Sequence, residues 1–397
     1  MSNSSSTTVL WMASSAAIVL GSLVVFLAYP QPDLKLEEDI LPLARKFVHK
    51  KKDDSTEDTP LIGVRVVITG ATGGIGLGLV ENFVTLGATV IAMGRSPTKL
   101  KEIQDTFSGK DIVPILVQLT DLESVRKAAE AIASQFDRID ILVNNAGIHY
   151  FASADGKAPT TPQGLDVSWG VNYMSHFLLT EKMIPLLKRS SYTPTVIQIS
   201  SSFHCAVDGS EIIIPDDRSK DPLVAVPGTF SANSVFGAQR AYANSKLAQI
   251  LHARALQRRH PELVARSICP CWVGTGIGGN FMGMILGRLA YPSNGYGVKS
   301  ALTAALDTTS PKSADWYTNS QCTGWLDSYF PNLIYEPWFY RYGFRDVLAL
   351  CYANALIMAT QRFLTKVEAR KPSPETYNKD LQESLYEWSH QRVKSFL

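Results

Sequence analysis

The sequence has few cysteines and no excess of charge of either sign. Its five cysteines are odd in number, and apart from one Cys-Pro-Cys they lack the spacing of zinc ligands, so no metal site is predicted. They also do not resemble a secreted disulfide framework, which favours a reducing compartment for the folded part. The net charge is only +2, which indicates no nucleic-acid partner. Hydrophobic residues make up 45% of the chain, enough for a large core.

Charge is also absent from one N-terminal stretch, from Val9 to Tyr29. A helix needs about 20 apolar residues to cross the hydrocarbon core of a bilayer. A cleaved signal peptide is the alternative, but its apolar region is usually shorter and follows a basic leader, whereas Met1 to Thr8 carries no charge. The prediction is a transmembrane anchor within residues 1–30.

The segment after this stretch, residues 31–62, is rich in Pro, Lys and acidic residues and predicts a linker with at most one short helix. Its basic residues include Arg45, Lys46 and Lys50. By the positive-inside rule they place the main domain, residues 63–397, in the cytosol on a single-pass anchor, in the endoplasmic reticulum or another organelle surface. The alternative is that this basic run is simply a solvated linker, diluted by nearby acidic residues.

From residue 63 onward, short β-branched runs alternate with segments of helical periodicity. Strands are expected at residues 64–68, 89–92, 113–119, 139–143, 195–199 and 265–268, and helices at 76–86, 98–107, 122–135, 169–188 and 240–259. Such alternation predicts parallel strands joined by helical crossovers. The fold class is therefore α/β: a Rossmann-like doubly wound parallel sheet with helices on both faces. Residues 205–239 and the tail after about residue 291 interrupt the pattern and are expected at the ligand-binding edge.

A glycine-rich loop, Thr69-Gly70-Ala71-Thr72-Gly73-Gly74-Ile75-Gly76, stands between the first expected strand and the first helix. Glycines let the backbone turn sharply and approach a pyrophosphate, and a helix N-terminus supplies N–H groups and a positive dipole end. A simple flexible turn is the alternative, which the position between strand and helix disfavours. The loop predicts a dinucleotide site.

Tyr242 and Lys246 lie one helical turn apart in the segment Tyr242-Ala243-Asn244-Ser245-Lys246. A tyrosine has an ordinary pKa of about 10, and a nearby ammonium favours its ionised form. Such a phenol can exchange a proton with a substrate oxygen during hydride transfer. Alone, this spacing is also typical of a solvated helix face.

Three further motifs accompany the pair: Asn144-Asn145-Ala146-Gly147 after the fourth strand, Asn172 in a long helix, and Ile199-Ser200-Ser201-Ser202 after the fifth strand. With the glycine loop, this order resembles the short-chain dehydrogenase/reductase family over roughly residues 63–307, with gaps. The resemblance implies a catalytic tetrad. Tyr242 is then the general acid/base, Ser201 orients the substrate oxygen, Lys246 lowers the tyrosine pKa and holds the nicotinamide ribose, and Asn172 kinks its helix and holds a proton-relay water. Ser200 is the alternative to Ser201, because successive strand residues face opposite sides.

The same resemblance implies the cofactor-binding residues. Besides Arg95, they are Gly70, Thr72, Gly74, Ile75, Gly76, Gln118, Leu119, Asn145, Ala146, Gly147, Tyr242, Lys246, Pro270, Val273 and Thr275. Two positions depart from the family pattern. Cys271 replaces the usual glycine after Pro270, and Gln118 replaces the usual aspartate beside the adenine, where an amide can still accept a hydrogen bond.

The choice between the two nicotinamide dinucleotides depends on the end of the second strand, where an acidic residue would bind the ribose of NAD. That stretch, Met93-Gly94-Arg95-Ser96, has no acid. Arg95 offers a charged planar fork suited to a 2′-phosphate. NADP(H) is therefore predicted ahead of NAD(H); the alternative is a solvent-facing arginine.

Residues 171–180, residues 242–248 and the long insert between Ser201 and Tyr242 resemble the branch of the membrane-anchored retinol dehydrogenases and the WW-domain oxidoreductase. The implied function is an NADP(H)-dependent oxidoreductase that interconverts an alcohol and a carbonyl on a small lipophilic substrate, retinoid-like, sterol-like or a fatty aldehyde. The alternatives are a steroid, sterol or protochlorophyllide-type reductase, and a non-catalytic NADP(H)-binding scaffold. A homodimer is left open.

Three segments of the tail stand apart from the family pattern. Residues 347–363 are apolar and indicate a core helix or an interfacial one. Residues 331–344 are dense in aromatic side chains, typical of a lipophilic tunnel, a headgroup-level surface or ordinary packing. Residues 381–393 predict a surface helix that closes the domain.

Overall fold

The computed structural model describes residues 34–48, 59–149, 159–201, 203–204, 207, 209, 212, 235–270, 295–309, 316–318, 368–370 and 372–397. The expected membrane anchor, most of the insert at 205–239 and the tail segments 331–344 and 347–363 lie outside these residues. Within the described part of the chain, no helix has the length and apolar character needed to span a bilayer.

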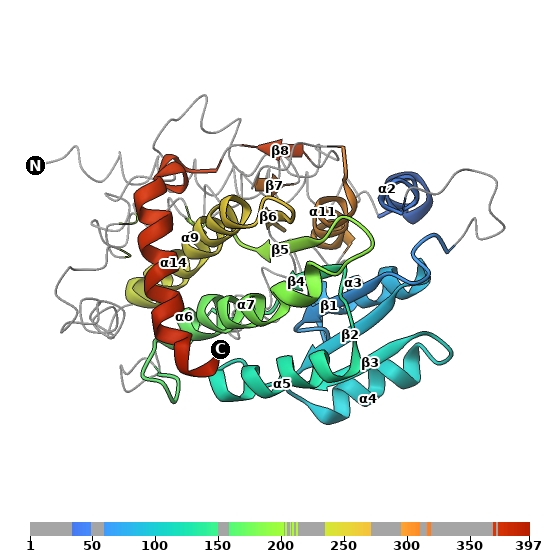
Figure 1. Cartoon of the computed structure of the whole chain (residues 1–397), viewed down its shortest axis with the longest axis horizontal. Coiled ribbons are helices and arrows are strands. Elements are labelled where there is room, and N and C mark those ends of the chain that lie inside the picture. Colours follow the sequence, from blue (N-terminus) through green and yellow to red (C-terminus); the bar gives the residue numbers. More distant parts are fainter. Residues whose placement is uncertain are drawn as a thin grey trace, which may run out of the picture.

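One sheet organises the described residues (Figure 1). Its strand order is β3-β2-β1-β4-β5-β6-β7-β8, and all neighbouring strands are parallel except the last pair. The strands are β1 (Arg65–Thr69), β2 (Thr89–Gly94), β3 (Ile112–Leu116), β4 (Ile141–Asn144), β5 (Thr195–Ile199), β6 (Val264–Cys269), β7 (Trp316–Thr318) and β8 (Glu368–Arg370). The predicted parallel α/β sheet is confirmed. The short antiparallel β8 at its edge was not predicted.

Helices cover both faces of the sheet (Figure 1). One hydrophobic cluster joins the sheet to helices α5 (Leu122–Gln135), α7 (Ser175–Leu187), α9 (Val235–Arg259) and α14 (Lys379–Val393). A second joins the other face to α2 (Leu41–Phe47), α3 (Gly74–Thr85), α4 (Pro97–Thr106) and α11 (Gly295–Leu306). Because both faces are buried, the central strands are almost continuously apolar, as in Val66, Val67 and Ile68 of β1.

Part of the segment expected to be a linker packs on the domain. The π-helical turn η1 (Leu36–Ile40) runs into α2, and Ile40, Ala44 and Phe47 are fully buried. The ring of Phe47 stacks on that of Tyr192, with 5.8 Å between centroids, and Lys299 of α11 forms a 2.8 Å salt bridge with Asp39. Residues 34–48 therefore contribute to the hydrophobic core and are not a solvated tether.

The C-terminal helix α14 is more deeply engaged than a surface helix. It lies along α9 (Figure 1), and its inner side buries Leu385, Tyr386 and Ser389. Tyr386 donates a 2.8 Å hydrogen bond to Glu181 of α7, and Ser389 bonds to Tyr173 at 2.7 Å. The sequence predicted a surface helix here, and only the outer face of α14 is at the surface.

The strand order reverses its direction between β1 and β4, and in doubly wound sheets such a reversal opens a crevice at the carboxyl ends of the strands. At this edge β1 ends at Thr69, β4 at Asn144 and β5 at Ile199. The glycine loop, the Asn-Asn-Ala-Gly motif and Ser201 follow these three strand ends.

Candidate active site

The glycine-rich loop turns tightly against the segment that follows β4. Gly70 and Gly74 have positive φ angles of 65° and 54°, which disfavour other residues. A side chain at Gly76 would place its Cβ 2.1 Å from the carbonyl oxygen of Gly70, so only glycine fits at that position. Asn145 braces the turn, because its Nδ2 donates to the Thr69 carbonyl at 2.7 Å.

The mouth of this loop is open. Nothing lies within 4 Å of the Cβ position of Gly73, and Gly73 itself is exposed just before the first turn of α3. Thr72 precedes this opening. Gly74 and Ile75 form the start of α3, and Ile75 is buried. The first N–H groups of a helix have no partners within it and attract anions. The loop therefore fits a dinucleotide pyrophosphate.

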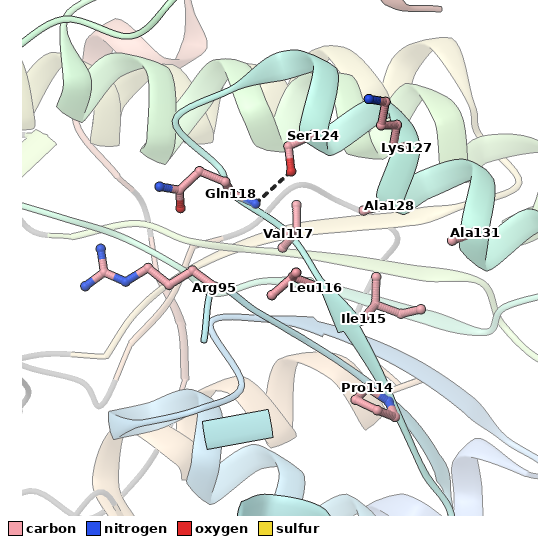
Figure 2. Close-up of a pocket in the computed structure, with 10 residues that line it drawn as sticks. All are labelled: Arg95, Pro114, Ile115, Leu116, Val117, Gln118, Ser124, Lys127, Ala128 and Ala131. Atoms are coloured by element: carbon pink, nitrogen blue, oxygen red, sulfur yellow. Dashed lines mark hydrogen bonds between the residues drawn. The ribbon is translucent and has the colours of Figure 1, made fainter. Parts of the chain in front are cut away.

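A groove of about 510 Å³ lies between β3 and α5 and is bordered by Arg95, which follows β2. Figure 2 shows the side chains of Arg95 and Gln118 at the same end of this groove, with residues of α5 along its length. The amide N–H of Gln118 donates to Ser124 at 2.9 Å, which fixes the backbone there, and both side chains remain exposed. The exposed guanidinium at the strand end is available to an anionic ligand.

Leu119 and Pro270, also predicted to bind the cofactor, are half-buried at the same sheet edge. Leu119 packs against the core beneath the groove, and Pro270 follows the end of β6. Cys271, Val273 and Thr275 lie outside the described residues.

Tyr242, Lys246 and Ser201 meet beyond the ends of β4 and β5. The hydroxyl of Ser201 lies close enough to the phenol of Tyr242 to lower the pKa of that phenol. The ammonium nitrogen of Lys246 lies 5.4 Å from the centroid of the Tyr242 ring and donates to the carbonyl of Ile199 at 2.9 Å. Gly147 borders this ammonium, since a Cβ there would lie 3.4 Å from Nζ. The geometry places a proton donor, a hydroxyl and a cation together.

Of the two adjacent serines, Ser201 is the one that reaches the phenol. Ser200 is buried, and its hydroxyl donates to the main-chain carbonyl of Lys246 at 2.7 Å. Ser200 therefore ties the end of β5 to the main chain of α9, whereas Ser201 acts on the Tyr242 side chain.

Burial has the largest effect on the pKa values of Tyr242 and Lys246. It raises the pKa of Tyr242 above its ordinary value, and Ser201 acts in the opposite direction. Burial also lowers the pKa of Lys246 to about 7. Near neutral pH the phenol is protonated, so in this state it is equipped to donate a proton. The sequence predicted that Lys246 lowers the pKa of Tyr242, but in the structure only Ser201 lowers it, and burial outweighs that effect.

Asn172 sits in a π-helical turn, η2 (Gly170–Met174), between the short helix α6 (Val167–Trp169) and α7. The sequence predicted one long helix with a kink at Asn172, and the π-helical turn lies at this position. The side chain of Asn172 closes on Ile148, accepting from its N–H at 2.8 Å and donating to its carbonyl at 2.9 Å. It also donates to Ser245 at 3.0 Å. This fully buried amide therefore fastens the segment after β4 to the helix that carries Tyr242 and Lys246.

Two aromatic rings beside Tyr242 were not singled out from the sequence. The His149 imidazole lies 4.6 Å from the Tyr242 ring and the Phe203 ring lies 5.8 Å from it, measured between centroids. Burial, followed by the charge of Lys246, lowers the pKa of His149 to about 4, so this ring is neutral at pH 7. Their positions directly after the Asn-Asn-Ala-Gly and Ser-Ser motifs could have indicated them.

Comparison with known proteins agrees with this geometry. The short chain dehydrogenase family matches residues 65–212, which include the glycine loop, the Asn-Asn-Ala-Gly motif, Asn172 and Ser201. The likeness to this family, predicted from the motifs, is confirmed over residues 65–212.

Two curated relatives show the extent of the likeness. An uncharacterized oxidoreductase of Schizosaccharomyces pombe is 31% identical over 208 residues, which cover 50% of this chain and 56% of that protein. Retinol dehydrogenase 14 of Mus musculus is 31% identical over 212 residues, covering 50% of this chain and 57% of the relative. The chain spans about half the length of these relatives, so the likeness to retinol dehydrogenases concerns this shared part.

A solved structure of an uncharacterized protein from Mycobacterium Paratuberculosis has the same fold. It is 22% identical and superposes with a TM-score of 0.55, covering 84% of this chain and 94% of that one. At this identity the likeness extends to the fold alone.

Proposed function

We propose that the protein is an NADP(H)-dependent oxidoreductase that interconverts an alcohol and a carbonyl on a lipophilic substrate. The observation that carries the proposal is the position of the Lys246 ammonium, 5.4 Å from the centroid of the Tyr242 ring, with Ser201 near the phenol and the glycine loop at the same sheet edge. A scaffold that only bound a dinucleotide would have no use for a buried phenol and a buried ammonium at the reacting end of the site.

Ser201, Tyr242 and Lys246 have different roles in the proposed reaction. Bound NADP(H) would supply or accept the hydride. Ser201 holds the substrate oxygen next to the phenol of Tyr242, which donates its proton when a carbonyl is reduced and takes it back in the reverse direction. Lys246 holds the nicotinamide ribose and stabilises negative charge that develops on the phenol.

Two features support the finer parts of the proposal. The exposed guanidinium of Arg95, at the end of β2, offers a bidentate partner for the 2′-phosphate that distinguishes NADP(H). The rings of His149 and Phe203 next to Tyr242 give this part of the site an aromatic lining. Such a lining suits a conjugated or alicyclic substrate of the retinoid or sterol kind better than a small polar one.

We further propose that the protein acts at a membrane through its N-terminal apolar stretch, with the catalytic domain in the cytosol. Lipophilic substrates partition into bilayers, so an enzyme held at the surface meets them there. A homodimer is compatible with this arrangement.

Turnover of retinaldehydes, sterol ketones and long-chain aldehydes, each with NADPH and with NADH, tests the proposal. We expect reduction of at least one lipophilic carbonyl with NADPH preferred. Binding of NADPH with no turnover of any member of the panel, in either direction, would favour the scaffold alternative.

A further inference from the structure

Gln249 lies one helical turn after Lys246 on α9 and is fully buried. Its side-chain oxygen accepts a 3.0 Å hydrogen bond from the ammonium of Lys246. Its side-chain nitrogen donates a 2.9 Å hydrogen bond to the main-chain carbonyl of Asn172. A single amide therefore spans the distance between two members of the tetrad.

Only one orientation of this amide satisfies both partners. An ammonium group can only donate and a main-chain carbonyl can only accept, so the oxygen must face Lys246 and the nitrogen must face Asn172. Both contacts are buried, and a reversed amide would leave two buried polar groups facing like groups. The pairing is thus specific to a glutamine: a carboxylate loses the donor, and an apolar chain loses both bonds.

The carbonyl of Asn172 is exposed to side chains because of the π-helical turn. In such a turn the main-chain bonds run to the fifth residue, as Ser175 N–H does to Gly170, and the usual helical pairing is displaced. The Asn172 carbonyl, within this π turn, accepts from Gln249 and from Nδ1 of His176, each at 2.9 Å. This carbonyl therefore orients Gln249.

We propose that Gln249 is a positioning residue that holds the ammonium of Lys246 beside Tyr242 and stabilises its charged form. The inference rests on the proposed function for its catalytic consequence, but the contact between Gln249 and Lys246 stands on the geometry alone. The Ile199 carbonyl supplies the second acceptor, so loss of Gln249 would leave Lys246 with one of two anchors.

Several titratable groups face Lys246 and set the background for its pKa. Tyr242 lies on the same helix, and the charge of Lys246 lowers the pKa of His149 after β4 and of His176 on α7. Cys269, at the end of β6, raises the pKa of Lys246 through the negative charge of its ionised form. None of these groups changes in the variants below.

Two isosteric substitutions test the proposal on the full-length protein in detergent. Gln249→Met removes the acceptor, so we expect a lower pKa for the Lys246 ammonium. Gln249→Glu puts a carboxylate in its place, so we expect a higher pKa. The direct measurement is an NMR titration of lysine side chains labelled with ¹⁵N, with the Lys246 signal assigned by its loss in Lys246→Met.

Turnover provides the second measurement, with all-trans-retinaldehyde and saturating NADPH. At high pH the rate of carbonyl reduction falls as the coupled Tyr242 and Lys246 pair loses its first proton. This alkaline limb should move to lower pH in Gln249→Met and to higher pH in Gln249→Glu. Because a hydrogen bond to a charged group is lost, kcat of Gln249→Met near pH 7 should fall about ten- to a hundred-fold.

Gln257 provides a matched control on the same helix. It also bridges two groups, donating to the Leu263 carbonyl and accepting from the Ala265 N–H, but it lies far along α9 from Lys246. Gln257→Met should lower stability without moving the Lys246 pKa or the alkaline limb.

If the Lys246 pKa stays the same in both Gln249 variants, or moves equally in Gln257→Met, Gln249 is only a tie between helices and the proposal is wrong. If the pKa moves in opposite directions as expected but the parent protein reduces no carbonyl, the proposal stands and the proposed function fails.

Discussion

The imidazole of His176 joins Thr69, at the end of β1, to Asn172 in the π-helical turn. Its Nδ1 donates to the Asn172 carbonyl at 2.9 Å, so its Nε2 is the acceptor for the Thr69 hydroxyl, also at 2.9 Å. The same hydroxyl accepts from the N–H groups of Asn145 and Ala146 at 2.9 and 3.0 Å. One neutral histidine thus connects the glycine loop, the Asn-Asn-Ala-Gly segment and the tetrad.

This connection depends on His176 being uncharged. Burial lowers its pKa to about 4 from an ordinary value of 6.5. A base whose folded-state pKa is depressed contributes stability above its unfolded pKa, and that stability is lost as pH falls toward the folded pKa. At pH 4.5 the loss should reach about 2–3 kcal/mol.

We therefore predict that His176→Gln costs less stability at pH 4.5 than at pH 7. At pH 7 the substitution breaks two buried hydrogen bonds, whereas at pH 4.5 it also removes the group that resists protonation. Urea unfolding of parent and variant at both pH values measures the difference. An equal or larger cost at pH 4.5 would show that His176 does not carry the pH dependence.

Substitution by alanine should affect stability differently at Gly76 and at Gly73 of the glycine-rich loop. Gly76→Ala forces a Cβ against the Gly70 carbonyl, so we expect a loss of more than about 2 kcal/mol in unfolding free energy. Gly73→Ala meets nothing within 4 Å and adopts an extended conformation that alanine tolerates, so stability should change by less than about 0.5 kcal/mol.

The same two substitutions distinguish an effect on folding from an effect on NADPH binding. Because the open space at Gly73 is where a pyrophosphate would approach, Gly73→Ala should weaken NADPH binding although the fold is intact. Fluorescence titration with NADPH measures this. Full NADPH affinity in Gly73→Ala would place the pyrophosphate elsewhere.

Cofactor preference should depend on Arg95. Arg95→Ala removes a charge-assisted contact typically worth about 1.5–3 kcal/mol, so the kcat/KM for NADPH should fall roughly ten- to a hundred-fold while that for NADH barely changes. Lys101→Ala, which removes an exposed cation of α4 paired with Asp105, is the control and should leave the ratio unchanged. An unchanged NADPH to NADH ratio in Arg95→Ala would make Arg95 an ordinary surface charge.

The adjacent Gly94 is a poor position for reversing this preference. A Cβ there would lie 2.8 Å from Cγ2 of Thr72 and 3.2 Å from Leu100. An acid introduced at Gly94 would therefore disturb the loop as well as the specificity, and Arg95→Asp is the cleaner reversal.

In the N-terminal region, we expect residues 1–32 to bind membranes and residues 34–48 to stabilise the folded domain. Deleting residues 1–32 should release the protein from membranes without lowering its unfolding temperature. Deleting residues 1–48 should also lower that temperature, because Ile40, Ala44 and Phe47 are fully buried. Sedimentation after a high-salt wash and thermal unfolding measure the two effects. A shorter deletion that still sediments with membranes would place membrane binding in another segment.

Local sequence patterns were sufficient to predict strands β1 to β6 and the motifs that follow them, but not the short strands β7 and β8. The alternation of buried runs and helical periodicity predicted the residues of β5 at both ends and α5 at both ends. The glycine loop and the Tyr-x-x-x-Lys spacing indicated the site because their geometry is set within one turn or one helix.

Features that depend on contacts between distant parts of the chain could not be predicted from local sequence patterns. At the π turn, His176 and Gln249 share the main-chain carbonyl of Asn172, and Ile148 pairs with its side-chain amide. Ile148 and Gln249 lie far from Asn172 in the sequence. The packing of residues 34–48 was missed because a charged, proline-containing stretch looks solvated when its apolar residues are counted together with its charges. The spacing of His176 and Gln249, four and three residues after tetrad members, was the available signal for both.

The central claim is that Tyr242 transfers the proton, and Tyr242→Phe tests it most directly. The ring and its contacts with His149 and Phe203 can remain, while the hydroxyl near Ser201 is lost. We predict that kcat for carbonyl reduction falls about a hundred- to ten-thousand-fold while NADPH affinity stays nearly the same. Retention of kcat within about tenfold, equivalent to ~1.4 kcal/mol of barrier, would contradict the account and show that another group supplies the proton.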